Sequence, residues 1–181
     1  MKFNPSILSQ ADYLLADQII GQERGGIYRE PDLVIAPNGQ PYLYRWHIVP
    51  HNKRAGVFLH VQVKSDPERP LHDHPWDNMS TILTGGYDEI WDSAPWMSDH
   101  HANVHKQVRK LRIGDTVSRK ASAAHRLLLP EEFEYTMTLF FTGPKIRQWG
   151  FWYPDGWRNA DDVTRLRDGV SVHIGEGHSN E

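Results

Sequence analysis

The chain has 181 residues, 39% of them hydrophobic, so it is long enough to bury a substantial core. Its formal net charge of −3 argues against nucleic acid or an anionic membrane surface as a partner. It contains no cysteine, which excludes disulfides, thiolate metal ligands and a cysteine nucleophile. The opening stretch MKFNPSILSQADYLLADQII is broken by polar residues and does not resemble a secretory signal, and no window has the roughly 18 apolar residues of a membrane span. We therefore expect a cytoplasmic protein.

The N-terminal segment predicts one helix over residues 5–20. Asn4 or Ser6 can cap it, and Pro5 suits its first turn. Apolar residues recur along the segment at roughly helical spacing until the glycines that begin with Gly21 end the helix.

After these glycines, runs rich in β-branched and aromatic residues alternate with turn signals such as APNGQP, TGG, RIGD and YPDG. Many short strands after one leading helix indicate an all-β antiparallel sandwich or barrel. We expect a single domain over 1–181, with the barrel core over about 41–153 and a C-terminal extension over 154–181. The expected strand runs cover residues 42–49, 57–63, 79–91, 104–117, 125–129, 133–142 and 147–153.

Two histidines, His72 and His74, are separated by one residue just before the run 79–91. In a strand, residues two apart point to the same side and lie about 7 Å apart. A metal with bonds of roughly 2.0–2.1 Å to imidazole nitrogen can sit between two such side chains. The chain has 11 histidines, so this pair taken alone is better explained by surface histidines.

The spacing that follows the pair resembles the signature of the cupin superfamily. In the first cupin motif, His-x-His is followed after three or four residues by Glu and after six more by Gly; here Asn78 and Gly85 occupy those two places. The second motif is Gly, five residues, Pro-x-Gly, two residues and His. Here Gly114 and His125 are in register, although the Pro and Gly places hold Lys120 and Ser122.

This resemblance covers about residues 41–142 and implies a cupin-type double-stranded β-helix, which is a jelly-roll barrel. It also implies a metal site whose ligands are His72, His74 and His125. Imidazole suits several transition metals. The resemblance favours Fe(II), with nickel, manganese and zinc as alternatives.

The glutamate ligand of the cupin motif is absent, which leaves three possible arrangements. Three histidines alone can hold the metal, as the resemblance to thiol dioxygenases within the cupin superfamily would permit. Asp77 can add a fourth ligand, although strand alternation places its side chain on the other face of the strand from His74. Asn78 shares the histidine face of a regular strand and can offer a weak carbonyl ligand or a hydrogen bond to a ligand. We expect three histidines with Asn78 nearby, and therefore open coordination positions.

Strand parity also predicts which other side chains line the pocket. Several side chains share an inward face with the expected ligands or lie on a strand of mixed polarity: Trp76, Ser80, Leu127, Leu129 and His60. An inward arginine would bind a carboxylate through its planar fork. The candidates are Arg45, Arg126 and Arg147.

Two further stretches carry chemistry-bearing residues. SDHHANVH, residues 98–105, holds His101 and His105 at helical spacing, but we expect a polar loop rather than a second metal site. The aromatic stretch RQWGFWYPDGW, residues 147–157, can form a ligand platform or a dimer contact. We expect it to cover the open end of a sheet.

Three functions are compatible with these observations. We expect a non-haem Fe(II)-dependent dioxygenase that acts on a small polar substrate. The alternatives are a metal-dependent isomerase or lyase of a sugar or keto acid, with His60 or Glu89 as the base, and a non-enzymatic cupin that binds a small molecule. The expected partners are the small-molecule substrate and a second copy of the chain in a homodimer.

Overall fold

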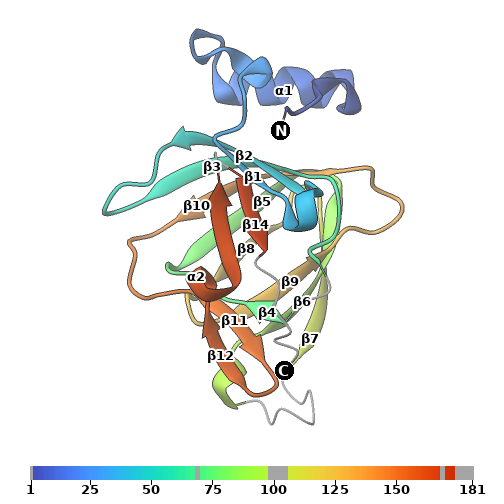
Figure 1. Cartoon of the computed structure of the whole chain (residues 1–181). Coiled ribbons are helices and arrows are strands. Elements are labelled where there is room, and N and C mark those ends of the chain that lie inside the picture. The colour runs from blue at the N-terminus through green and yellow to red at the C-terminus, as the bar shows by residue number, and fades with distance from the viewer. Residues whose placement is uncertain (1, 68–69, 98–105, 168–169, 174–181) are drawn as a thin grey trace.

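The computed structural model describes residues 2–67, 70–97, 106–167 and 170–173, which form two facing β-sheets (Figure 1). The larger sheet has the strand order β13-β14-β1-β2-β3-β10-β5-β8, and the smaller has the order β12-β11-β4-β9-β6-β7. Neighbouring strands pair antiparallel, except that β1 and β14 are parallel. The strands are β1 Leu33–Ile35, β2 Leu43–Val49, β3 Gly56–Gln62, β4 Leu71–His72, β5 Asn78–Thr84, β6 Gly86–Asp92, β7 Gln107–Arg112, β8 Thr116–Arg119, β9 Ala124–Leu128, β10 Thr136–Thr142, β11 Gly150–Tyr153, β12 Gly156–Asn159, β13 Thr164–Arg167 and β14 Val170–His173.

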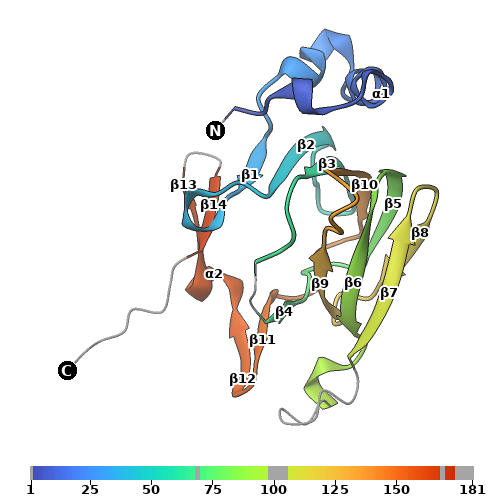
Figure 2. The same cartoon turned by 90° about the vertical axis from the view of Figure 1, so that its right-hand side faces the viewer.

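From β3 to β10 the chain changes sheet at every strand connection except that between β6 and β7, as expected for a double-stranded β-helix. The chain passes from β3 to β4, from β5 to β6, from β7 to β8 and from β9 to β10 by changing sheet each time. Figure 2 shows the same barrel from the side. The expected all-β double-stranded β-helix with an N-terminal helix is confirmed.

The turn at Gly85 is correctly predicted, but it does not close a hairpin. β5 pairs with β10 and β8, whereas β6 pairs with β7 and β9, so the expected run 79–91 divides at the crossing between sheets. Gly85 has a φ of +71°, and an added Cβ would lie 2.5 Å from the carbonyl oxygen of Tyr135. Only glycine satisfies both conditions at this corner.

The N-terminal helix is shorter than the sequence predicts. α1 spans Gln10–Ile20, and Ser9 caps it by accepting a hydrogen bond of 3.2 Å from the backbone of Asp12. A separate 3₁₀ turn, Pro5–Ile7, comes before it, with Asn4 as its cap. The backbone of Leu8 and Ser9 is extended, so the two segments cannot join into one helix.

Strands β2 and β3 bury a different set of side chains on each face. Trp46 and Leu59 are fully buried on the outer face, where the main hydrophobic core packs beneath α1 (Figure 1). Arg45 and His60 are cross-strand partners on the opposite face, toward the barrel interior. The period-2 alternation of a strand therefore supplies both the core and the pocket wall.

The segment after residue 153 extends both sheets. β12 forms a hairpin with β11, and β14 adds to β1, with Val34 paired to Val170. The short helix α2, Ala160–Val163, lies between them and buries Ala160 and Val163 against Phe151. Among the described residues, no helix combines the length and the apolar character needed to span a bilayer.

Candidate metal centre

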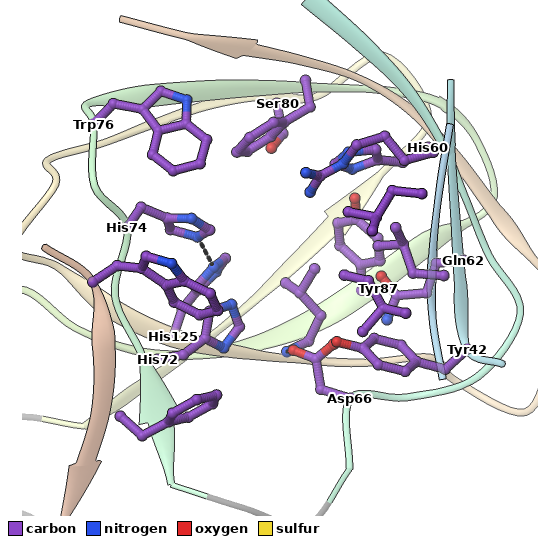
Figure 3. Close-up of a pocket in the computed structure, with 18 residues that line it drawn as sticks. Tyr42, His60, Gln62, Asp66, His72, His74, Trp76, Ser80, Tyr87 and His125 are labelled. Atoms are coloured by element: carbon purple, nitrogen blue, oxygen red, sulfur yellow. Dashed lines mark hydrogen bonds between the residues drawn. The ribbon is translucent and has the colours of Figure 1, made fainter. Parts of the chain in front are cut away.

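The three predicted histidines lie together on the inner face of the smaller sheet. His72 on β4 is the direct cross-strand partner of His125 on β9, and His74 follows two residues after His72. The ring centroids are 4.7 Å apart for His72 and His125, 5.2 Å for His72 and His74, and 5.0 Å for His74 and His125. One ring nitrogen from each residue lies within 4.8 Å of the others (Figure 3).

The geometry and the protonation of these rings suit a metal ion. Nε2 of His74 and Nε2 of His125 are 2.8 Å apart. Two ligand atoms bound to one ion at roughly 2.1 Å and about a right angle would lie about 3.0 Å apart. Burial, followed by the neighbouring His125 and His72, holds the pKa of His74 well below its usual range, so this ring is neutral at physiological pH. Neutral imidazoles are the form that binds metal.

A buried carboxylate orients one of the three rings. Glu89 on β6 is fully buried, and its Oε1 accepts a hydrogen bond of 2.6 Å from Nδ1 of His125. Nδ1 therefore carries the proton, and Nε2 presents its lone pair toward His74. In metal sites, a carboxylate behind a histidine fixes the tautomer and raises the basicity of the ligand.

Two arginines hold Glu89 in its ionised form. Arg109 lies directly opposite it on β7 and donates from Nε over 2.6 Å, and Arg119 on β8 donates to both carboxylate oxygens. Burial alone would raise the pKa of Glu89, but His125 and Arg119 outweigh it and keep the pKa well below its usual range. Glu89 does not line the cavity, so the prediction that it serves as a base for substrate is wrong.

Asn78, which holds the place of the cupin glutamate, and its neighbour Asp77 do not line the cavity. Asp77 accepts from the backbone of Ala121 over 2.8 Å and pairs with Lys120 over 3.0 Å, so its carboxylate is already bound elsewhere. Asn78 is buried but does not line the cavity, and its Oδ1 has no hydrogen-bond partner in the described structure. β4 ends at His72 and β5 begins at Asn78, so strand parity cannot be counted across the intervening residues.

A cavity of about 260 Å³ opens beside the histidines (Figure 3). His60, Trp76, Ser80, Leu127 and Arg45 line it, as the strand faces predict, whereas Leu129, Arg126 and Arg147 do not. Apolar side chains form most of its wall, which is typical of sites for small molecules. The lining residues are Leu33, Ile35, Tyr42, Leu43, Arg45, His60, Gln62, Asp66, His72, His74, Trp76, Ser80, Tyr87, His125, Leu127, Phe140, Trp149 and Phe151.

Asp73, between the two histidines, faces away from the cavity and anchors the aromatic stretch. Its fully buried carboxylate accepts from Arg147 and the backbone of Gly150, each over 2.7 Å, and from the indoles of Trp152 and Trp157, each over 3.1 Å. The stretch expected to cover a sheet end therefore also builds the pocket, because Trp149 and Phe151 line it. The predicted polar loop with His101 and His105 lies outside the described residues.

No protein-family model matches the chain. No curated protein matches it in sequence. Solved structures that resemble it include HppE in its FeII form (9% identity, 59% of this chain and 53% of that chain covered, TM-score 0.46) and the DMSP lyase DddQ from Ruegeria pomeroyi (15% identity, 64% and 54% covered, TM-score 0.47). A cupin superfamily protein from Desulfitobacterium hafniense also resembles it (14% identity, 56% and 77% covered, TM-score 0.42). The chain spans about half the length of the first two.

Proposed function

We propose that this chain, which has the cupin fold, is a mononuclear non-haem Fe(II) dioxygenase of a small polar substrate, with His72, His74 and His125 as the metal ligands. The observation that carries the proposal is the convergence of three ring nitrogens within 4.8 Å of one another, at the wall of a cavity. Among the described residues, no carboxylate joins this group. Three neutral donors leave coordination positions for a substrate and dioxygen.

The side chains around the site have separable tasks. Glu89 holds the His125 ring in the tautomer that leaves Nε2 free to bind. The apolar wall, including Phe140 and Phe151, limits the water beside the histidines. A ferrous ion held there would supply the open positions at which a bound substrate meets dioxygen. The preference for iron comes from the resemblance to cupin thiol dioxygenases, since three imidazoles also suit zinc and nickel.

The isomerase or lyase alternative has less support because neither of the two residues expected as its base is placed to act as one. Glu89 lies behind His125, away from the cavity. Nε2 of His60 accepts a hydrogen bond of 2.8 Å from Nε of Arg45. Burial, followed by the charge of Arg45, also holds the pKa of His60 well below its usual range. Neither residue is set up to remove a proton from substrate at neutral pH.

Metal content and oxygen dependence test the proposal. We expect purified protein reconstituted with Fe(II) without oxygen to hold close to one ion per chain, and His72→Ala and His125→Ala to hold far less. His51→Ala is the matched control, since His51 is exposed, hydrogen-bonds to the backbone of Gly143, packs edge-on against Trp76 and is not one of the three proposed ligands. Nitric oxide should give the electron paramagnetic resonance signal of a ferrous nitrosyl in the wild type and in His51→Ala, but not in His72→Ala or His125→Ala. Failure of the wild type to take up iron, nickel or zinc would overturn the proposal.

Two further outcomes separate the alternatives. Metal binding without a nitrosyl signal, together with turnover supported equally by manganese or zinc in the absence of oxygen, would favour the isomerase. The homodimer is also a proposal, which sedimentation velocity of the same protein would check.

A further inference from the structure

One positive charge at the wall of the cavity, that of Arg45, has no carboxylate beside it in the part of the chain that the structure describes. Asp66, the carboxylate that also lines the cavity, accepts a hydrogen bond of 2.9 Å from the backbone of Leu127. Arg45 on β2 is half-buried and borders the cavity, and among the described residues no carboxylate lies within ion-pair distance of it. Burial lowers the pKa of Arg45 to about 10, so the guanidinium stays charged at neutral pH. A cation withdrawn from water without an anion is costly unless a ligand supplies the opposite charge.

The guanidinium is held so that its terminal nitrogens remain available. Nε donates to Nε2 of His60 over 2.8 Å, and the carbon of the guanidinium lies 5.0 Å from the ring centroid of Phe58. Nη1 and Nη2 make no hydrogen bond to any described residue, and neither is among the fully buried atoms without a partner. The two nitrogens that form the fork for a carboxylate are thus fixed in place and accessible.

The fork and the histidine cluster are separated by one aromatic ring. The ring centroid of Phe140 lies 5.1 Å from that of His60 and 5.8 Å from that of His74, and all three residues line the cavity. Figure 3 shows His60 across the pocket from His72, His74 and His125. A molecule a few bonds long could therefore reach from the arginine to the histidines across the face of Phe140.

We propose that Arg45 binds the carboxylate of a small organic acid, and that His60 is the positioning residue that orients the guanidinium. The opposite end of the acid would lie against the three histidines, so this substrate class rests on the proposed function. The cavity of about 260 Å³ is large enough to hold a small organic acid. A neutral analogue of the same shape would leave the charge of Arg45 uncompensated.

Malonate, malonamide and inorganic phosphate test this inference on metal-free protein, so that no metal contributes to binding. Titrations followed by isothermal calorimetry and by the ¹⁵Nε resonances of arginine should show malonate binding at least tenfold more tightly than malonamide or phosphate. Arg45→Gln should lose at least tenfold in malonate affinity, and Arg45→Lys should lose less because it keeps the charge without the fork. Arg158→Gln, which removes a surface pair with Asp155, should bind malonate as the wild type does.

Equal affinities for malonate and malonamide, or unchanged malonate binding in a folded Arg45→Gln protein, would overturn the inference. Preferential binding of phosphate would overturn the assignment of a carboxylate. If Arg45→Gln does not fold, the comparison between Arg45→Lys and wild type decides, and equal malonate affinities would overturn the role of the fork. The proposed metal function fails separately: His125→Ala should keep malonate binding in metal-free protein while losing metal.

Discussion

Glu89 and His125 form a hydrogen bond of 2.6 Å between a carboxylate oxygen and Nδ1, while Nε2 of the same imidazole lies 2.8 Å from His74. The two ring nitrogens therefore have different tasks: one is held by the protein, and the other faces the proposed metal site. The sheet pairing explains the geometry, because Trp91 on the strand of Glu89 is the direct partner of His125. Glu89, two residues earlier, lies diagonally opposite His125.

We predict that Glu89→Gln weakens metal binding by roughly 10- to 100-fold, because the amide no longer fixes the His125 tautomer with a full negative charge. The change also leaves Arg119, whose side chain is 3% exposed, without its ionic partner, so stability should fall as well. The measurement is a competition titration of Co(II) or Fe(II) against a chelator, made on protein shown by circular dichroism to be folded.

Glu132→Gln is the control for that substitution. The side chain of Glu132 is 58% exposed, and its carboxylate pairs with Arg112 at the surface. The control substitution should leave both metal affinity and stability close to wild type. A folded Glu89→Gln protein with wild-type metal affinity would show that the carboxylate behind His125 has no part in metal binding.

We predict that Asp73→Ala lowers the free energy of unfolding by about 2–4 kcal/mol, since it leaves several buried donors without an acceptor. Those donors come from Gly150, Arg147, Trp152 and Trp157, so β11 should also pack less firmly against β4. Urea unfolding followed by tryptophan fluorescence measures the loss. Glu30→Ala removes an exposed pair with Lys2 and should change the stability by less than about 1 kcal/mol. Equal losses in the two variants would contradict the role assigned to Asp73.

The contact between α1 and the barrel should depend on pH through Asp12. Its carboxylate accepts from the hydroxyls of Ser9, Tyr135 and Thr84. Burial raises the pKa of Asp12, but these hydrogen bonds outweigh it and leave the pKa below its ordinary value. A carboxyl with a lowered folded-state pKa stabilises the protein fully above its unfolded value, about pH 4, and loses that contribution as the pH falls through the folded value.

We therefore predict that Asp12→Asn costs about 1 kcal/mol at neutral pH, after allowance for solvent screening, and that the deficit shrinks as the pH falls below about 4. Urea unfolding of both proteins at a series of pH values measures this difference. Asp161→Asn alters an exposed carboxylate on α2 and serves as the control. A deficit that stays constant from neutral pH to acid would rule out ionised Asp12 as the source of the stabilisation.

The local patterns of the sequence predicted much of the fold. Glycine at Gly85 and Gly114 marks turns with positive φ, and period-2 alternation placed Arg45 and His60 on candidate pocket faces. The resemblance of two histidine motifs to the cupin signature implied that His72, His74 and His125 share one site, and the structure brings the three together. The turns and the strand faces are readable because each depends on backbone geometry over a few neighbouring residues.

The partners of those residues depend on contacts between distant segments. The turn at Gly85 joins two sheets rather than two paired strands, because β10 and β8 already pair with the two edges of β5. Glu89 meets Arg119 and His125 across 30 and 36 residues of sequence, and Asp73 meets Arg147 across 74. Arg45 and Arg147 differ in what lies opposite them: a carboxylate neutralises Arg147, and a cavity faces Arg45. The sequence shows that these groups can carry a charge, but the tertiary structure determines which charges meet, because it sets the distance between them.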